Sequence, residues 1–153
     1  MVTIRIAKPE EIRHLVPIYK ASYTEHNIFM KSEEEVRNYL ENLRGTFIIA
    51  EEDSRIVGGL CIQKSITAAN HVLAKFVHFA VDKGHRRMGI GTAIFGAAER
   101  AIGKGKIELF VSEKSQEFLE FYKSLGYEME GKLKNHFRPN EFCYILGKTL
   151  EKP

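Results

Sequence analysis

The segment from residue 76 to residue 102 constrains the fold most, because an apolar strand leads through a basic, glycine-containing turn into a helix. β-Branched and aromatic residues are frequent at 76–81, and apolar residues recur at helical spacing between residues 94 and 102. Gly89 and Gly91 therefore stand where the helix begins. A helix start leaves about four backbone N–H groups unpaired and carries about half a positive charge, and glycine lets an anion approach them closely. The junction predicts a phosphate-binding site.

Two common phosphate-binding motifs do not fit this junction. Its glycines, at positions 84, 89 and 91, lack the spacing of the Rossmann fingerprint, and no acidic residue follows at the expected distance. A P-loop is excluded because no Gly-Lys-Ser/Thr sequence ends the run. Glycine is also common at ordinary helix starts, so a turn without a ligand is the alternative. The side chains of Lys83 and His85 are further candidates for phosphate contacts, with a solvated basic turn as their alternative.

The same junction resembles the acetyl-CoA signature of the GNAT superfamily of N-acetyltransferases, in which an Arg or Gln is followed at fixed spacing by Gly and then by Gly or Ala. Arg86, Gly89 and Gly91 occupy these places. A second family motif follows at the usual separation, because residues 107–127 resemble the next strand and helix and end in the sequence FYKSLGY at 121–127. Two motifs in order are much more specific than either motif alone.

The resemblance implies that acetyl-CoA is the cosubstrate and that no metal takes part. In the family, the backbone at the end of the preceding strand pairs with the pantetheine arm, and the helix start holds the pyrophosphate. The residues expected to bind the cofactor are Phe79, Ala80, Val81, Arg86, Arg87, Met88, Gly89, Ile90, Gly91, Thr92, Ser115 and Phe118.

The order of the predicted elements agrees with the resemblance and favours a single-domain α/β (α+β) fold over residues 1–153. We expect a GNAT-like, mixed and mostly antiparallel central sheet of six to seven strands, flanked by about four helices. Helices are predicted at 9–26, from the N-cap Ser32 to Gly45, at 91–102 and at 115–125. Strands are predicted at 3–7, 46–51, 55–65, 74–81, 106–112, 127–133 and 142–150.

The composition favours one soluble enzyme domain. The chain has 153 residues, 44% of them hydrophobic and 28% charged, and its apolar runs are too short to span a bilayer. Residues 1–5 lack signal-peptide architecture, so a cytoplasmic location is expected. The net charge of +3 is spread over the chain, which disfavours a nucleic-acid-binding domain. Cys61 and Cys143 lie in apolar runs and are expected to be buried, reduced thiols.

Tyr122 is the candidate catalytic residue. Phe118 and Tyr122 follow Ser115 by three and seven positions, so the three residues share one face of the predicted helix. In the family, the equivalent tyrosine commonly protonates the departing thiolate, and the resemblance implies this role for Tyr122. Ser115 stands where many members carry an Asn that contacts the pantetheine. The alternative is that Tyr122 is a core aromatic residue.

No residue stands out as the general base. Strand alternation counted back from the turn places Lys75, Val77 and Phe79 on the site face, and none of them suits the task. His78 falls on the opposite face, where a packing or surface histidine is expected unless a β-bulge changes the alternation. Glu108 on the neighbouring strand is a second candidate. The absence of an evident base favours weakly basic acceptors such as an α-amino group, whose pKa is about 8.

The expected reaction is direct transfer of the acetyl group of acetyl-CoA to a primary amine of a small molecule or peptide, without a covalent enzyme intermediate. Backbone donors at the end of the central strand would steady the oxyanion. Segments 23–30 and 135–140 are expected to select the acceptor, with Glu25, His26 and His136 as lining residues. The alternative function is a non-catalytic acyl-CoA-binding module with a degenerate amine site. A homodimer is compatible with the sequence.

Overall fold

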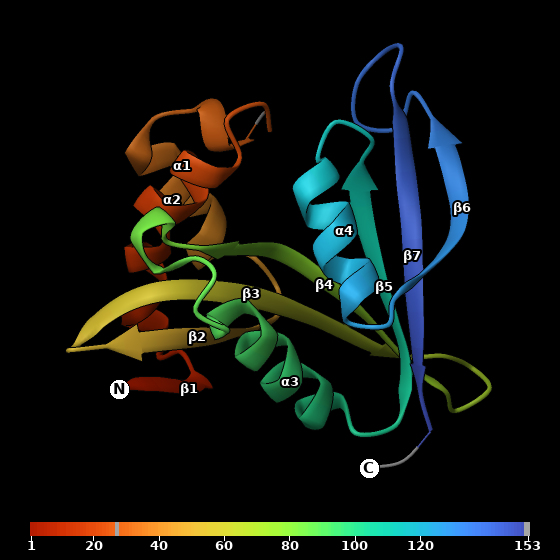
Figure 1. Ribbon diagram of the computed structural model, residues 1–153, viewed down its shortest axis with the longest axis horizontal. Helices are drawn as coiled ribbons and strands as arrows, with labels where there is room; N and C mark the ends of the chain where they lie inside the picture. Colours follow the sequence, from red (N-terminus) through yellow and green to blue (C-terminus); the bar gives the residue numbers. More distant parts are fainter. Residues whose placement is uncertain (27, 152–153) are drawn as a thin grey trace. The chain divides into compact units, whose positions relative to one another are not determined.

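The structure, a computed structural model, describes residues 1–26 and 28–151 (Figure 1). Its strands are β1 (Val2–Ile6), β2 (Thr46–Glu52), β3 (Arg55–Ile66), β4 (Val72–Val81), β5 (Gly105–Ser112), β6 (Glu128–Lys134) and β7 (Phe142–Leu150). Its α-helices are α1 (Val16–Ser22), α2 (Glu33–Glu41), α3 (Ile90–Ile102) and α4 (Gln116–Ser124), and its 3₁₀ helices are η1 (Pro9–Leu15), η2 (Ile28–Met30) and η3 (Lys83–His85). Every predicted strand is present, and its ends lie within two residues of the predicted ones.

The described residues form one seven-stranded sheet in the order β1-β2-β3-β4-β5-β7-β6. β4 and β5 are parallel, whereas the pairs β1–β2, β2–β3, β5–β7 and β6–β7 are antiparallel. The predicted α/β fold is therefore confirmed, with a mixed, mostly antiparallel sheet and four α-helices in the described part of the chain.

The chain divides into two compact units. Unit 1 comprises residues 1–63 and 78–101, and unit 2 comprises residues 64–77 and the chain from Ile102 onward. β3 and β4 contribute residues to both units, so the division falls within strands. The cofactor-binding turn predicted after β4 belongs to unit 1, and the predicted acid on α4 belongs to unit 2.

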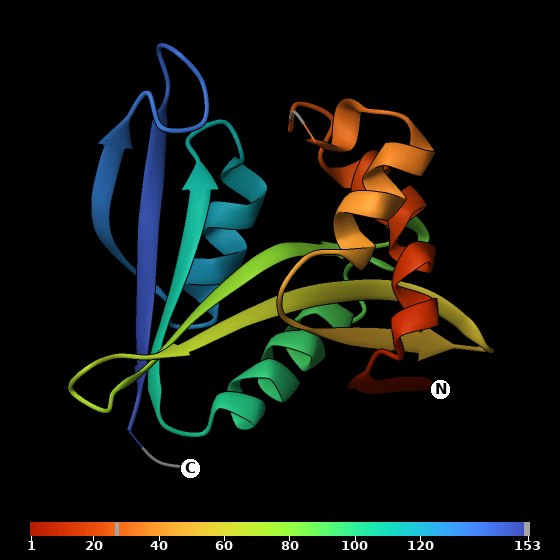
Figure 2. The same cartoon turned by 180° about the vertical axis from the view of Figure 1, so that it is seen from behind.

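In unit 1, helices lie on both faces of the strands, as the two opposite views in Figures 1 and 2 show. Two adjacent glycines of β3 permit this close packing. A Cβ atom on Gly59 would lie 2.6 Å from Cδ2 of Leu15 in η1, and a Cβ atom on Gly58 would lie 3.1 Å from Cδ1 of Ile94 in α3. Because successive strand residues point to opposite faces, η1 packs on one face of β3 and α3 packs on the other.

In unit 2, α4 lies against the sheet formed by β5, β7 and β6 (Figure 1). Alternate side chains of β5 are buried, at 5% exposure or less, namely those of Ile107, Leu109 and Val111. The intervening side chains of Lys106, Glu108 and Phe110 are half-buried on the opposite face. α4 ends before Gly126, whose φ of +94° is a left-handed conformation that favours glycine.

The prediction of a single helix over residues 9–26 is wrong. The chain forms the 3₁₀ helix η1, and α1 begins only at Val16 and ends at Ser22. Pro17 explains this late start, because its nitrogen carries no N–H to donate to the carbonyl four residues earlier and proline is tolerated only in the first turn of an α-helix. The apolar periodicity instead reflects core packing of both helices, since Leu15, Val16 and Tyr19 are buried.

The second helix begins as predicted and ends early. The Oγ atom of Ser32 accepts a hydrogen bond from the Glu35 N–H at 3.2 Å, which is an N-cap. α2 ends at Glu41, ahead of the predicted stop at Gly45. Gly45 instead serves close packing, because a Cβ atom there would lie 2.6 Å from the Sγ atom of Cys61.

Both cysteines are buried free thiols, as predicted. Burial raises the pKa of Cys61 to about 12 and that of Cys143 to about 11. Because the thiolate is the reactive form, thiols with such pKa values are unreactive at neutral pH.

Candidate functional site

The turn between β4 and α3 has the geometry of an anion site. Arg87 and Gly89 have left-handed backbone conformations, with φ of +61° and +80°. Apart from the neighbours of Gly89 in the chain, no heavy atom of the described residues lies within 4 Å of the position that its Cβ would take. The turn therefore has open space at the residue that precedes the helix.

Backbone donors are available at the same place. The first hydrogen bond of α3 runs from the Ala93 N–H to the Gly89 carbonyl oxygen at 3.0 Å. The N–H groups of Ile90, Gly91 and Thr92 precede this bond, so they have no acceptor within the helix. Ile90 is 4% exposed, and its burial fixes the start of the helix. Three backbone donors and the positive end of the helix dipole thus meet beside open space.

The side chain of Arg86, the first residue of the predicted acetyl-CoA motif, makes hydrogen bonds within the protein. Its Nε atom donates to the Val81 carbonyl oxygen at 3.2 Å, and Nη2 donates to Ser22 Oγ at 3.1 Å. Because Ser22 is the last residue of α1, Arg86 ties the turn to that helix. The side chains of Lys83 and Arg87 are exposed on the same turn. Arg86 therefore shapes the turn.

His85 also braces the turn. Its Nδ1 atom lies 2.8 Å from Asp82 Oδ2, and its Nε2 atom lies 2.7 Å from Oε2 of Glu52 at the end of β2. The hydrogen bond to Asp82 raises the pKa of His85 above its ordinary value of 6.5, the bond to Glu52 adds to it, and desolvation opposes both. His85 thus holds the turn between two carboxylates, and neither ring nitrogen is left to contact a phosphate.

The end of β4, where the pantetheine arm is predicted to bind, is held firmly. The side chains of Phe79, Ala80 and Val81 are buried, at 8% exposure or less. The Tyr23 hydroxyl donates to the Phe79 carbonyl oxygen, and the Asp82 N–H donates to the carbonyl oxygen of residue 57 at 2.7 Å. Contacts from the residue that follows α1 and from β3 therefore fix this strand end within unit 1.

His78 interrupts β4 three residues before that end. Its φ of +54° is left-handed, which is uncommon for a non-glycine residue inside a strand. A left-handed residue breaks the strict alternation of side chains in the way that a β-bulge does. The alternation that sets His78 apart from the site face therefore does not hold at this residue.

The His78 ring lies in an aromatic cluster that includes part of the predicted acceptor segment. Its Nε2 atom is 2.7 Å from the Tyr39 hydroxyl, and its ring centroid is 5.0 Å from that of Phe29 and 5.7 Å from that of His26. Burial first, and then the charge of His26, lower the pKa of His78 to about 4, so the ring is neutral at pH 7. Asn27 of the same segment lies outside the described residues. We call Tyr19, Tyr23, His26, Phe29, Tyr39 and His78 the His78 cluster.

The predicted acid and two predicted cofactor contacts lie on α4 in unit 2. Ser115 is the N-cap residue of this helix, and its side chain makes no capping hydrogen bond to the described backbone. The rings of Phe118 and Tyr122 are stacked, with centroids 6.0 Å apart and planes at 23°. Tyr122 is 6% exposed, and its ring lies 6.5 Å from that of Tyr127. Their spacing in the sequence correctly places Phe118 and Tyr122 side by side.

Two other candidate residues lie on the half-buried face of unit 2. Glu108 on β5 has Lys75 of β4 as its register partner. His136 is exposed in the turn between β6 and β7, and its ring lies 5.7 Å from that of Phe110 and 4.9 Å from that of Phe137. The acceptor-selecting turn predicted at 135–140 therefore presents aromatic side chains. In the other predicted segment, Glu25 is exposed.

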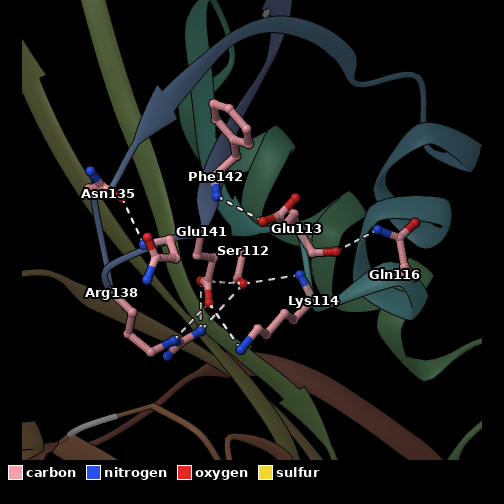
Figure 3. Close-up of polar contacts among 9 residues, drawn as sticks. Ser112, Glu113, Lys114, Gln116, Asn135, Arg138, Glu141 and Phe142 are labelled. Atoms are coloured by element: carbon pink, nitrogen blue, oxygen red, sulfur yellow. Dashed lines mark hydrogen bonds and ion pairs between the residues drawn. The ribbon is translucent and has the colours of Figure 1, made fainter.

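No sequence pattern predicts the polar network beside this turn, which Figure 3 shows. The Glu141 side chain is 2% exposed. Its Oε1 atom accepts hydrogen bonds from Ser112 Oγ at 2.6 Å and Arg138 Nη2 at 2.8 Å, and its Oε2 atom accepts one from Arg138 Nε at 2.9 Å. The bond from Arg138 lowers the pKa of Glu141 below its ordinary value, that from Ser112 adds to it, and desolvation opposes both.

The described residues offer no sign of two other kinds of site. Over 1–26 and 28–151, no three or more His, Cys, Asp or Glu side chains are grouped to hold a metal ion. Over the same residues, no helix combines the length and apolar character needed to cross a membrane. What they do offer is the turn before α3, the His78 cluster and α4.

The chain is similar to known proteins. Residues 44–129 match the family model of the acetyltransferase (GNAT) domain, and they make up 86 of the 153 residues. An N-alpha-acetyltransferase of Sulfurisphaera tokodaii is 23% identical over 162 aligned positions, which cover 96% of this chain and 92% of the relative. The family match includes the whole junction from β4 to α3 and the whole of α4.

Solved structures share the fold. Ard1 from Thermoplasma volcanium has a TM-score of 0.79 at 24% identity, over 99% of this chain and 99% of that one. Arabidopsis thaliana Naa50, in complex with the bisubstrate analogue CoA-Ac-MVNAL, has a TM-score of 0.73 at 14% identity, over 97% of this chain and 98% of that one. With the family model matching more than half of its length, the chain belongs to the GNAT superfamily of N-acetyltransferases and is an acyltransferase.

Proposed function

We propose that the protein binds acetyl-CoA at the turn between β4 and α3 and transfers the acetyl group to a primary amine. The N–H groups of residues 90–92 and the open space at Gly89 suit a pyrophosphate. By resemblance to the family, the backbone of residues 79–81 would meet the pantetheine arm, and Ser115 and Phe118 would add contacts from α4. The analogue bound to Arabidopsis Naa50 contains CoA, which supports acetyl-CoA as the donor.

The acceptor that we propose is the free α-amino group of a peptide. The relative from Sulfurisphaera tokodaii is an N-alpha-acetyltransferase, and the analogue bound to Naa50 carries the peptide sequence MVNAL. The His78 cluster supports the same choice, because a histidine with a pKa of about 4 is a weak base. A lysine amine with a pKa of about 10.4 needs a strong base, whereas an α-amine with a pKa of about 8 is partly neutral at pH 7.

The proposed step needs no covalent enzyme intermediate. The amine nitrogen attacks the thioester carbonyl carbon, so that a C–N bond forms and the C–S bond to CoA breaks, and the amine proton passes to water. We assign the proton taken up by the thiolate to the Tyr122 hydroxyl, which water then reprotonates. Between an ordinary phenol and an ordinary thiol, with pKa values of about 10 and about 8.5, such a transfer is uphill by only about 2 kcal/mol.

The whole chain takes part in this proposal as one N-acetyltransferase domain over residues 1–153. The turn before α3 belongs to unit 1 and Tyr122 belongs to unit 2. The alignment with the Sulfurisphaera tokodaii relative, which covers 96% of this chain, supports a single functional domain.

The observation that carries the proposal is the open Gly89 ahead of three backbone donors without helical acceptors. The test is acetyl transfer from acetyl-CoA to the peptide MVNAL, followed by mass spectrometry. We expect one acetyl group on the α-amine. A control peptide with a blocked N-terminus and an internal lysine should stay unmodified. Acetylation of that lysine alone would contradict the proposed acceptor, and cofactor binding without any transfer would favour the non-catalytic acyl-CoA-binding module.

A further inference from the structure

The turn between β4 and α3 contains an unfavourable backbone conformation next to the proposed anion site. Arg87 has a φ of +61°, a left-handed value that is uncommon for a residue with a side chain. Such a conformation persists only where the surrounding structure holds it. Arg87 stands two residues before Gly89, so the contacts that hold the turn also decide where the N–H groups of residues 90–92 point.

Two adjacent side chains anchor this turn within unit 1. Arg86 donates to Ser22 Oγ at 3.1 Å and so reaches the last residue of α1. The His85 ring is held at both nitrogens, with Nδ1 2.8 Å from Asp82 Oδ2 and Nε2 2.7 Å from Glu52 Oε2. Glu52 is the last residue of β2, so His85 connects the turn to that strand. We call Glu52, Asp82 and His85 the His85 bracket.

The His85 bracket depends on the protonation of the ring. A charged imidazole carries an N–H on both nitrogens and can donate to both carboxylates. A neutral imidazole carries one N–H, so its other nitrogen presents a lone pair to a carboxylate oxygen, and the two repel each other. Only the charged ring can therefore connect Asp82 to Glu52.

The surroundings of the ring favour the charged form and leave it open to titration. The hydrogen bond to Asp82 raises the pKa of His85 above its ordinary value of 6.5, desolvation opposes this shift, and the bond to Glu52 adds to it. The His85 side chain is 19% exposed, and a cleft of about 490 Å³ is lined in part by Asp82 and Arg55. The other charged residues on the adjoining segments are Glu51, Asp53, Arg55, Lys83, Arg86 and Arg87.

We infer that His85 is a positioning residue for the cofactor: its charged ring holds residues 86–89 so that the N–H groups of residues 90–92 face the pyrophosphate. When the ring loses its proton, it loses one of its two carboxylate partners, and Arg87 relaxes toward a more common conformation. The affinity for acetyl-CoA therefore falls as pH rises through the titration of His85. This inference rests on the proposed function and adds to it a pH dependence of cofactor binding.

The test is the Kd for acetyl-CoA, measured on the full chain by isothermal titration calorimetry between about pH 7 and about pH 9.5. In wild type we expect Kd to rise by about 3- to 10-fold over this range. The rise should have the midpoint that NMR gives for the His85 ring. Acetyl-CoA has no free thiol, and a phosphate monoester has its second pKa at about 6, so titration of the ligand contributes little.

Two substitutions in the bracket separate its two forms. His85→Gln has no titrating ring and can donate to only one carboxylate, so its Kd should lie near the wild-type value at high pH and stay constant. Glu52→Gln can offer its amide oxygen to a ring N–H or its amide N–H to a bare ring nitrogen. The connection then survives in both forms, and Kd should stay near the wild-type value at low pH.

The control is His14→Gln, which removes an exposed histidine of η1 in the same unit and should keep the wild-type pH profile. If His85→Gln does not fold, Glu52→Ala takes its place. Glu52→Ala removes the connection to β2 at every pH, so it should bind acetyl-CoA as weakly as wild type does at high pH.

The outcomes distinguish this inference from the proposed function. A wild-type Kd that does not change with pH, or a rise that persists in His85→Gln or in Glu52→Ala, would overturn the inference and leave the cofactor site in place. A rise that persists in Glu52→Gln would indicate that the ring acts on the phosphate itself, which would overturn the positioning role. A wild-type protein that binds no acetyl-CoA at any of these pH values would contradict the proposed function, and the inference with it.

Discussion

Tyr122 and Tyr127 form a matched pair of residues that separates catalysis from packing. They are 6% and 2% exposed, and their rings lie 6.5 Å apart. Tyr122→Phe keeps the ring and its stacking on Phe118, so we expect kcat to fall by about 10²- to 10⁴-fold with little change in Kd for acetyl-CoA. Tyr127→Phe removes a hydroxyl from the same core and should leave kcat unchanged. Single-turnover kinetics measures both, and a Tyr122→Phe enzyme as fast as wild type would exclude the proposed acid.

His85 predicts a pH dependence of stability with a definite sign. Its pKa is raised in the folded state, mainly by Asp82 and then by Glu52. Its contribution is therefore complete below the unfolded pKa of about 6.5 and is lost as pH rises through the folded pKa. His85→Gln should lower the free energy of unfolding more at about pH 6 than at about pH 9. Urea unfolding at both pH values tests this, and equal losses would contradict the two ion pairs.

Some single-residue features could be predicted from the sequence, and others could not. Ser32 as N-cap and Gly89 at a helix start depend on a few neighbouring residues, so local pattern is enough. The left-handed backbone of His78 is set by its neighbours in space. The bond between Ser112 and Glu141 joins residues 29 positions apart, which no local spacing predicts.

At the scale of elements, two glycines of unit 1 predict opposite effects of the same substitution. The new Cβ of Gly59→Ala in β3 would lie 2.6 Å from Cδ2 of Leu15, which is fully buried, so we expect a loss of about 1–3 kcal/mol in the free energy of unfolding. The new Cβ of Gly96→Ala in α3 would meet only Arg100 Nη1, at 3.3 Å, the end of a flexible exposed side chain.

Gly96→Ala should therefore raise the free energy of unfolding by about 0.5–1 kcal/mol, because glycine loses more backbone entropy in a helix than alanine. Chemical denaturation of both variants measures the two changes. Changes of the same sign would contradict the difference in packing between β3 and α3.

The elements themselves follow the sequence closely where the pattern is strong. The strand ends predicted from apolar and β-branched residues lie within two residues of the observed ends. The strand, turn and helix from β4 to α3 form as predicted. The prediction of the first helix is wrong because its apolar spacing is helical, whereas the missing N–H of Pro17 delays the α-helix. A local chemical rule therefore overrides periodicity at that position.

At the scale of the whole molecule, the sheet order combines sequence neighbours with long-range pairs. β2 and β3 pair as sequence neighbours joined by a short connection. β1, in contrast, pairs with β2 across about 40 intervening residues. Periodicity alone cannot specify such a pair. The two family motifs lie in different units.

Thermal unfolding with and without acetyl-CoA tests whether the turn between β4 and α3 binds this cosubstrate. At a hundred times Kd, binding adds about 2.7 kcal/mol, which raises Tm by about 2–8 °C. Gly89→Glu places a carboxylate and a strained backbone at the anion site and should abolish the rise.

The matched control is Gly84→Glu, an exposed position of the same turn where a Cβ would meet only Asp82 Oδ2, at 3.4 Å. It adds the same charge away from the helix start, so most of the rise in Tm should remain. We expect a rise in Tm in wild type and in Gly84→Glu that is lost in Gly89→Glu. No rise in wild type at saturating acetyl-CoA, or a full rise in Gly89→Glu, would contradict it.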